Sequence, residues 1–129
     1  MTHNLATDNP NQAWYEMYET YAAQGALKAA AGKDARGRKN NSPVLHYTLS
    51  WHPSDQPTEE QMKDAAKSSL KALGLSEHEA LIAGHNDKDH AHVHIVVNTI
   101  HPQTGMTAPM KFQKLALSRW AEAYEREHV

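Results

Sequence analysis

The segment that constrains this chain most is residues 92–98, whose sequence His-Val-His-Ile-Val-Val-Asn starts as an alternation of polar and apolar side chains. In a β-strand, side chains two residues apart point to the same face and lie about 6.6 Å apart along the chain. We therefore expect Val93, Ile95 and Val97 to be buried on one face. The other face is expected to carry His92, His94, Val96 and Asn98.

A second strand is predicted over residues 44–51, because the same alternation recurs there. One side carries Leu45, Tyr47, Leu49 and Trp51, and the other carries His46, Thr48 and Ser50. A short apolar run at 81–83 predicts a third strand that leads into His85. Residues 86–89 are polar and turn-prone, so this strand and the histidine strand, which we place at 92–100, are expected to form an antiparallel hairpin.

The first helix is predicted to begin at the N-terminal side of the chain. Asn9 is a favourable N-cap and Pro10 a favourable first helical residue, because proline has no N–H to leave unsatisfied. The helix is expected to continue through an alanine-rich stretch toward Gly32. Its expected apolar stripe consists of Trp14, Met17, Tyr18, Tyr21 and Ala22.

Two further helices are predicted. The capping-box sequence at 58–61 begins one that Gly74 ends, and the other occupies residues 111–128. The pattern predicts one α+β domain over residues 1–129, with an antiparallel sheet flanked by helices. No apolar run approaches the roughly 18 residues that a membrane span requires, so we expect no membrane association. The first residues have neither the basic nor the apolar region of a secretory signal, so we expect a cytoplasmic setting.

Histidine is the residue type that points to chemistry. Ten residues are histidine and none is cysteine, so imidazole and carboxylate are the strong metal ligands that the chain offers. His92 and His94 lie side by side on one strand, and His85 is placed to reach them across the hairpin. Three protein ligands with open positions are typical of a site that handles substrate, and Asp87 is placed to orient an imidazole. The alternative is a surface histidine pair that titrates without binding metal.

A basic loop is predicted over residues 28–43. Five of the thirteen basic residues fall between positions 28 and 39, against the single acid Asp34, whereas the whole chain has a net charge of −2. That overall charge argues against indiscriminate coating of nucleic acid, so DNA contacts are expected to be local and salt-sensitive. The alternative is a merely solvated connection. The predicted DNA-binding residues are Lys33, Arg36, Arg38, Lys39, His46, Thr48 and Asn98.

The histidine segment also forms a recognisable series of short motifs. They are His85-x-Asp87, His92-Val93-His94-Ile95-Val96-Val97-Asn98 and Ile100-His101-Pro102-x-Thr104-Gly105. This series resembles the histidine motif of the relaxase and mobilization nuclease family, within the His-hydrophobe-His endonucleases. The likeness extends to residues 45–51 and 117–122, so it covers most of residues 44–128.

The resemblance implies an antiparallel sheet flanked by helices and a role for each motif residue. It makes His85, His92 and His94 a metal triad, Asp87 its acidic neighbour, and Ser50 the serine that helps hold DNA near the nick. In this family a tyrosine hydroxyl attacks a DNA phosphate, which leaves a 5′-phosphotyrosyl link and a free 3′-hydroxyl. The metal binds a non-bridging phosphate oxygen and stabilises charge that develops in the transition state.

The resemblance also implies the cofactor and the partners. We expect Mg²⁺ or Mn²⁺ to serve catalysis, while Zn²⁺, Ni²⁺ and Co²⁺ are also compatible with imidazole ligands. The expected partners are single-stranded DNA at a transfer origin and the accessory proteins of a relaxosome, in the bacterial cytoplasm.

The resemblance is incomplete at the beginning of the sequence. Family members start with a strand and then the nucleophilic tyrosine, whereas here 43 residues precede Val44 and open almost directly into a helix. We therefore expect the N-terminal strand to be missing. Tyr18 and Tyr21 are the candidate nucleophiles, but both lie on the expected core stripe, and Tyr15 is expected to face solvent. Either the sequence begins inside the domain, or the chain binds metal and DNA without nicking.

Three functions are consistent with these motifs. The leading one is relaxase-type DNA strand transfer in plasmid mobilization or conjugation. The second is binding of metal and single-stranded DNA without nicking. The third is a zinc hydrolase in which a metal-bound water attacks and Asp87 or Asp89 acts as base. Replication initiators of the same wider superfamily use a similar histidine pair, but the serine strand and the closing helix favour mobilization.

Overall fold

The structure, a computed structural model, describes residues 1–33, 39–86, 91–109 and 113–128, and only the backbone of residues 85, 86, 127 and 128. Its helices in these ranges are α1 (Pro10–Ala22), α2 (Gln24–Ala30), α3 (Glu59–Ala72) and α4 (Gln113–His128). Its strands there are β1 (Thr2–His3), β2 (Val44–Ser50), β3 (Ala80–Asn86) and β4 (Ala91–Asn98). The fold is α+β, which confirms the expected class.

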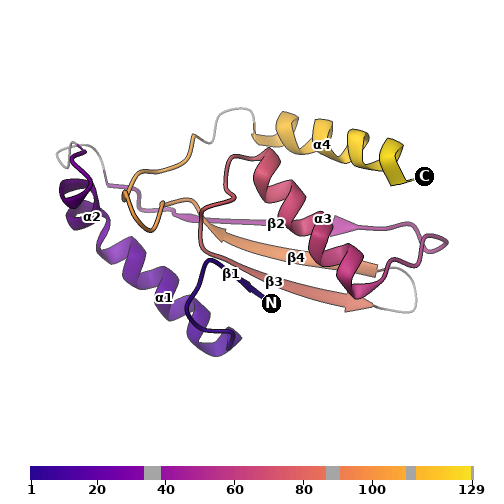
Figure 1. The fold of residues 1–129 in the computed structure, drawn as a ribbon, viewed down its shortest axis with the longest axis horizontal. Coiled ribbons are helices and arrows are strands. Elements are labelled where there is room, and N and C mark those ends of the chain that lie inside the picture. The colour runs from indigo at the N-terminus through magenta and orange to yellow at the C-terminus, as the bar shows by residue number, and fades with distance from the viewer. Residues whose placement is uncertain (34–38, 87–90, 110–112, 129) are drawn as a thin grey trace.

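The four strands form one antiparallel sheet in the order β1-β3-β4-β2. β4 is therefore central, with β3 on one side and β2 on the other, as Figure 1 shows. The expected hairpin of β3 and β4 is confirmed, and β3 is longer than the three apolar residues at 81–83 indicated. The expected alternation in β4 is also confirmed, because its buried and partly exposed residues alternate from Ala91 to Val97.

The sheet begins with a two-residue strand, β1, near the N-terminal end of the sequence. β1 pairs with β3 through Thr2 opposite Leu81 and His3 opposite Ala80. The Met1 ammonium group donates to the Ile82 carbonyl at 2.8 Å, and the Ile82 N–H donates to the Met1 carbonyl at 2.8 Å. A two-residue strand has no alternation to read, so the sequence pattern did not predict β1.

One face of the sheet and α3 form the hydrophobic core. Val93, Ile95 and Val97 of β4 are buried against apolar residues of α3, including the fully buried Leu70. The capping box that begins α3 is confirmed, since the Thr58 and Gln61 side chains each accept from the other's backbone N–H. α4 lies on the same side as α3 and is tied to it by a 2.8 Å hydrogen bond from the Trp120 indole to Ser68 Oγ. Figure 1 shows both helices along the strands.

The structure differs from two predictions about the first helix. It is two helices, because the chain turns at Ala23, where the Gln24 side chain donates to the Tyr21 and Asn40 carbonyls. Its buried face is also not the expected aromatic stripe: the residues buried in α1 are Ala13, Met17 and Thr20. Trp14, Tyr15 and Tyr18 are 62%, 54% and 56% exposed.

The physical reason is what α1 packs against. It covers the end of the sheet at which β4 finishes (Figure 1), and its contacts there are with polar groups of the sheet, such as the Asn98 side chain bonded to the Met17 carbonyl. Small and polar residues fit that contact better than large aromatic rings. Within the described part of the chain, no helix combines the length and the apolar character that crossing a bilayer requires.

Candidate active site

The strand register places the predicted site residues in rows on the face opposite the core. His92 of β4 lies directly between His85 of β3 and Ser50 of β2. In the next row, His94 lies opposite Thr48. Residues directly opposite each other in an antiparallel pair have Cβ atoms about 4.5–5.5 Å apart and share a face. Side chains predicted from three separate segments therefore start from adjacent positions on one surface.

This surface is open where the rows lie. His46, Thr48 and Ser50 are exposed, whereas His92 and His94 are half-buried. α3 and α4 cover the opposite face, and α1 lies at the other end of the sheet (Figure 1). No described helix therefore covers the row of His92 and Ser50.

The imidazoles of His92 and His94 in β4 are close to each other. The ring centroids of His92 and His94 lie 5.1 Å apart with an interplanar angle of 87°. His94 Nδ1 lies 3.2 Å from His46 Nε2 and 3.2 Å from Thr48 Oγ1, so side chains of β2 hold this edge of the ring. The His46 and His94 rings are stacked, with centroids 5.4 Å apart and planes inclined by 30°.

Two of the three proposed ligands, His92 and His94, are close enough to share a divalent metal. A metal–imidazole bond spans about 2.1 Å, so two rings at the separation of His92 and His94 can converge on one ion. His85 starts from the position opposite His92, although its side chain and the whole of Asp87 lie outside the described residues. Among the side chains that are described, no three histidine or carboxylate groups gather as a metal site. The triad therefore stays a prediction supported by the backbone register.

Asn98 does not have the role predicted for it. It lies on the histidine face, opposite Val44, but it is 1% exposed. Its Nδ2 donates to the Met17 carbonyl at 3.1 Å and to Glu79 Oε1 at 3.4 Å, and its Oδ1 accepts from the Ile100 N–H at 3.0 Å. Because α1 covers this end of the face, Asn98 joins the helix to the sheet and is not available to DNA.

The candidate tyrosines lie at the covered end as well. Tyr18 directly follows Met17, whose carbonyl is bonded to Asn98, and Asn98 is six residues from His92, about 20 Å along a strand. The Tyr21 ring lies under the Lys39 ammonium group, 4.8 Å from it. The structure therefore does not bring Tyr18 or Tyr21 to the histidine row.

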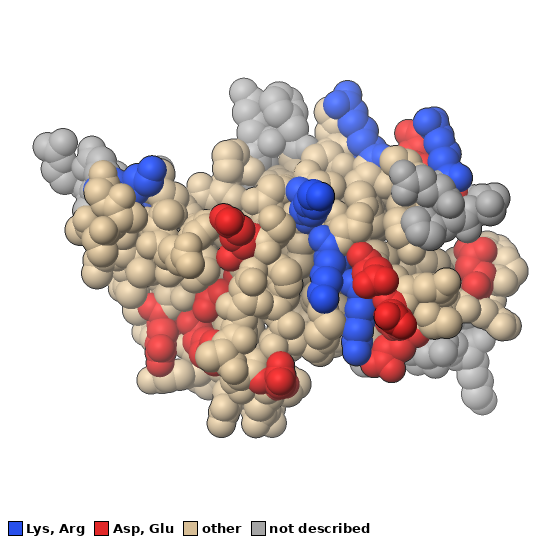
Figure 2. All heavy atoms as spheres, in the orientation of Figure 1, with Lys and Arg blue, Asp and Glu red and all other residues tan. Residues whose placement is uncertain are grey.

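The predicted basic loop is described only in part. Lys33 and Lys39 are exposed, whereas Arg36 and Arg38 lie outside the described residues. Lys28 is 7% exposed, so it belongs to the packing of α2. α1 carries Glu16 and Glu19 and no basic residue, and Figure 2 shows acidic side chains gathered over that part of the molecule. Most basic side chains in this view lie over α3 and α4, and others lie at the left, over the region of α2.

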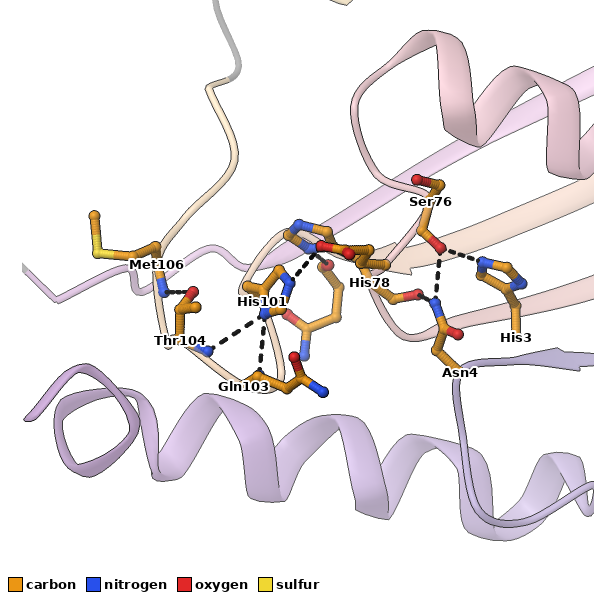
Figure 3. Close-up of polar contacts among 10 residues, drawn as sticks. His3, Asn4, Ser76, His78, His101, Gln103, Thr104 and Met106 are labelled. Atoms are coloured by element: carbon orange, nitrogen blue, oxygen red, sulfur yellow. Dashed lines mark hydrogen bonds and ion pairs between the residues drawn. The ribbon is translucent and has the colours of Figure 1, made fainter. Parts of the chain in front are cut away.

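The end of the histidine motif has a structural role that the sequence did not reveal. His101 Nε2 lies 3.0 Å from Glu77 Oε2, and its Nδ1 accepts from the backbone N–H groups of Gln103 and Thr104 (Figure 3). Gly105 has a φ of +68°, and a Cβ there would collide with the Gln24 carbonyl. The motif residues after β4 therefore form a tight loop packed on α2.

Buried ionisable groups lie at the same end of the molecule. Burial lowers the pKa of His78, which donates from Nδ1 to the Asn98 carbonyl at 2.8 Å. Burial raises the pKa of Glu79, although hydrogen bonds from Thr20 and Asn98 partly offset this effect. Sequence patterns missed both residues, because they precede β3 in a polar segment that has no periodicity.

Comparison with known proteins identifies one family and several relatives of this chain. The model of the nuclease domain of MobA/VirD2-like relaxases matches residues 1–129. Protein MobA of Acidithiobacillus ferrooxidans is 35% identical over 66 residues, which are 51% of this chain and 16% of that protein. A Protein TraI of Escherichia coli is 29% identical over 111 residues, 85% of this chain and 15% of the relative.

A third relative is the group II intron-interrupted relaxase LtrB of Lactococcus lactis subsp. cremoris, 30% identical over 88 residues, 67% of this chain and 16% of the relative. The aligned part is thus about one sixth of the length of each of these curated relatives. No solved structure gives a significant match.

Proposed function

Because the chain belongs to the family of MobA/VirD2-like relaxase nuclease domains, we propose that it acts on single-stranded DNA at a transfer origin in plasmid mobilization or conjugation. The observation that carries this proposal is the row of His85, His92 and Ser50 on the open face of the sheet. The family match favours this function over the zinc-hydrolase alternative. The place of action would be the bacterial cytoplasm, with accessory relaxosome proteins as further partners.

His85, His92 and His94 would hold a divalent metal, Mg²⁺ or Mn²⁺ in the working protein. When bound there, such an ion supplies positive charge for a non-bridging oxygen of the DNA phosphate. Because Nδ1 of His94 contacts side chains of β2, metal ligation by this residue would use Nε2. Asp87 would orient the imidazole of His85, two residues before it.

The remaining polar groups of the open face would bind the DNA strand. Ser50, exposed and directly opposite His92, would donate from its hydroxyl to an oxygen of the same phosphate. Thr48 and His46 continue the polar surface along β2. The basic loop would hold the DNA strand beyond the start of β2. Its phosphate contacts would be Lys33, Arg36, Arg38 and Lys39.

The nicking step needs a tyrosine hydroxyl at the histidine row, and the position of α1 bears on this step. Tyr18 and Tyr21 lie at the opposite end of the sheet. This separation favours a second candidate function, in which the chain binds metal and single-stranded DNA without nicking through either residue.

A labelled single-stranded transfer-origin oligonucleotide, incubated with the protein and Mn²⁺, separates the two candidates. Nicking predicts a covalent protein–DNA adduct by mass spectrometry that Tyr18→Phe or Tyr21→Phe removes. Binding without nicking predicts a gel shift and no adduct. A matched control is His3→Ala, on the edge strand β1, which should leave both results unchanged. Absence of any oligonucleotide binding at low salt would contradict both candidates.

A further inference from the structure

We propose that His46 is a positioning residue for the metal site, which holds the imidazole of His94 through Nδ1 so that His94 ligates through Nε2. This inference rests on the proposed metal site and adds to it a residue that is not a ligand. His46 comes from β2, whereas the metal triad comes from β3 and β4.

The contact between the two rings follows from the strand register. His46 is directly opposite Val96, and His94 is directly opposite Thr48, so the two histidines are diagonal neighbours on one face. Diagonal neighbours are about 7–8 Å apart at the backbone, which long side chains can bridge. The result is a 3.2 Å contact from His46 Nε2 to His94 Nδ1, with the rings stacked at 30°. Contact at Nδ1 and stacking together restrict rotation of the His94 ring.

The chemistry of the contact determines which nitrogen binds metal. A histidine that ligates through Nε2 carries its proton on Nδ1 and donates it to a neighbouring acceptor, which fixes both tautomer and ring orientation. Neutral His46 with its own proton on Nδ1 presents the lone pair of Nε2 to that proton. His46 thus has the position and the acceptor atom that a carboxylate or a carbonyl provides beside many metal-bound histidines.

Thr48 is a second partner of the same nitrogen, at 3.2 Å from its Oγ1. Its hydroxyl can donate or accept and rotates freely, so it favours neither tautomer strongly. The stacked His46 ring also occupies the space beside His94. For both reasons we assign the larger effect to His46 and a smaller one to Thr48.

Co²⁺ titration followed by visible absorption tests the proposal with three variants. His46→Leu removes the acceptor and keeps an apolar side chain, and should weaken Co²⁺ binding about 10–100-fold and change the d–d bands. His46→Gln, whose Oε1 can accept from the same N–H, should bind within about threefold of the original protein and keep its spectrum. Thr48→Val should lie between them. His3→Leu is the matched control for loss of an imidazole, and each variant is checked for folding by circular dichroism.

A second readout needs no metal. Nitrogen chemical shifts of the His94 ring report its tautomer, which should be mainly Nδ1–H in the original protein and in His46→Gln, and mixed in His46→Leu. The proposal is overturned if His46→Leu retains the affinity, the spectrum and the tautomer of the original protein. If the original protein takes up no Co²⁺ at all, the proposed metal site falls, and this inference falls with it. Uptake that is equal in all variants removes only the role of His46.

Discussion

The two ends of the sheet face that carries the histidines have the same alternating sequence pattern but differ in exposure. At one end, His92 and Ser50 lie in a row that no helix of the described chain covers. At the other end, Asn98 lies on the same face of the same strand but is buried under α1. Alternation along a strand therefore decides which face a side chain joins, whereas tertiary packing decides whether that side chain is available to a ligand.

Among the changes that distinguish the two ends, Asn98→Ala is expected to have the largest effect on the free energy of unfolding. This change removes the side-chain contacts to the Met17 carbonyl and the Ile100 N–H and opens a small cavity, at a cost of about 3 kcal/mol in unfolding free energy. A decrease of Tm by about 10 °C should follow for a domain of this size. Thr48→Ala, on the exposed part of the face, is the control and should shift the unfolding free energy by less than about 0.5 kcal/mol. Equal effects of the two changes would contradict the contrast between the ends.

For metal affinity, the large effect is expected at the exposed end of the sheet face, where His94 lies. His94→Ala removes a proposed ligand from the half-exposed end, so Mn²⁺ binding measured by calorimetry should weaken by about 100-fold or more. Its effect on Tm should be no more than about 3 °C, because the side chain is not in the core. A large loss of stability with unchanged Mn²⁺ affinity would mean that His94 serves packing.

The sequence predicted the exposed end well for a clear physical reason. β2, β4 and α3 each have a strong period of apolar residues, and a capping box marks the start of α3. Since β2 and β4 each bury one face, their alternation fixes which residues share the open face. The row of His92 and Ser50 thus followed from local pattern once the strands were paired.

The covered end could not be predicted in the same way. α1 buries Ala13 and Thr20 with Met17, a face without a strong apolar signal, while its aromatic residues are exposed. β1 has two residues and no alternation at all. The burial of Asn98 depends on where α1 docks, which is a tertiary event that no local pattern records.

A smaller effect on Tm is expected from Glu79, which belongs to the buried polar contact at the covered end. Because burial raises the pKa of Glu79, the folded state holds this proton more tightly than the unfolded chain, and the stabilisation is lost as pH rises above the usual 4.5. Glu79→Gln keeps the shape without the charge, so we expect its Tm at pH 8 to exceed that of the original protein by about 3 °C.

The comparison should be made at pH 7 and above, since His78 acts with the opposite sign. Burial lowers the pKa of His78, so its contribution to stability is present above 6.5 and is lost as pH falls below that value. Thermal unfolding of both proteins at pH 7, 8 and 9 is sufficient. A variant that melts with or below the original protein at each pH would show that the Glu79 carboxylate is well accommodated in its ionised form.

The smallest effect is expected from the exposed side of α1. Tyr18→Ala should alter the unfolding free energy by less than about 0.5 kcal/mol, because that side chain is 56% exposed. Met17→Ala, its buried neighbour, serves as the reference, and its loss of about 2 kcal/mol or more is measured by the same urea titration. A loss of unfolding free energy in Tyr18→Ala as large as that in Met17→Ala would indicate that the aromatic stripe is part of the core after all.

The most direct measurement for the metal site is a crystal structure of the protein with Mn²⁺, recorded with anomalous scattering from manganese. We expect one anomalous peak with a nitrogen of His85, His92 and His94 each within about 2.3 Å, slightly longer than a zinc–imidazole bond. This expectation would be contradicted by imidazoles that point apart with no peak between them, or by a peak bound to residues elsewhere on the chain.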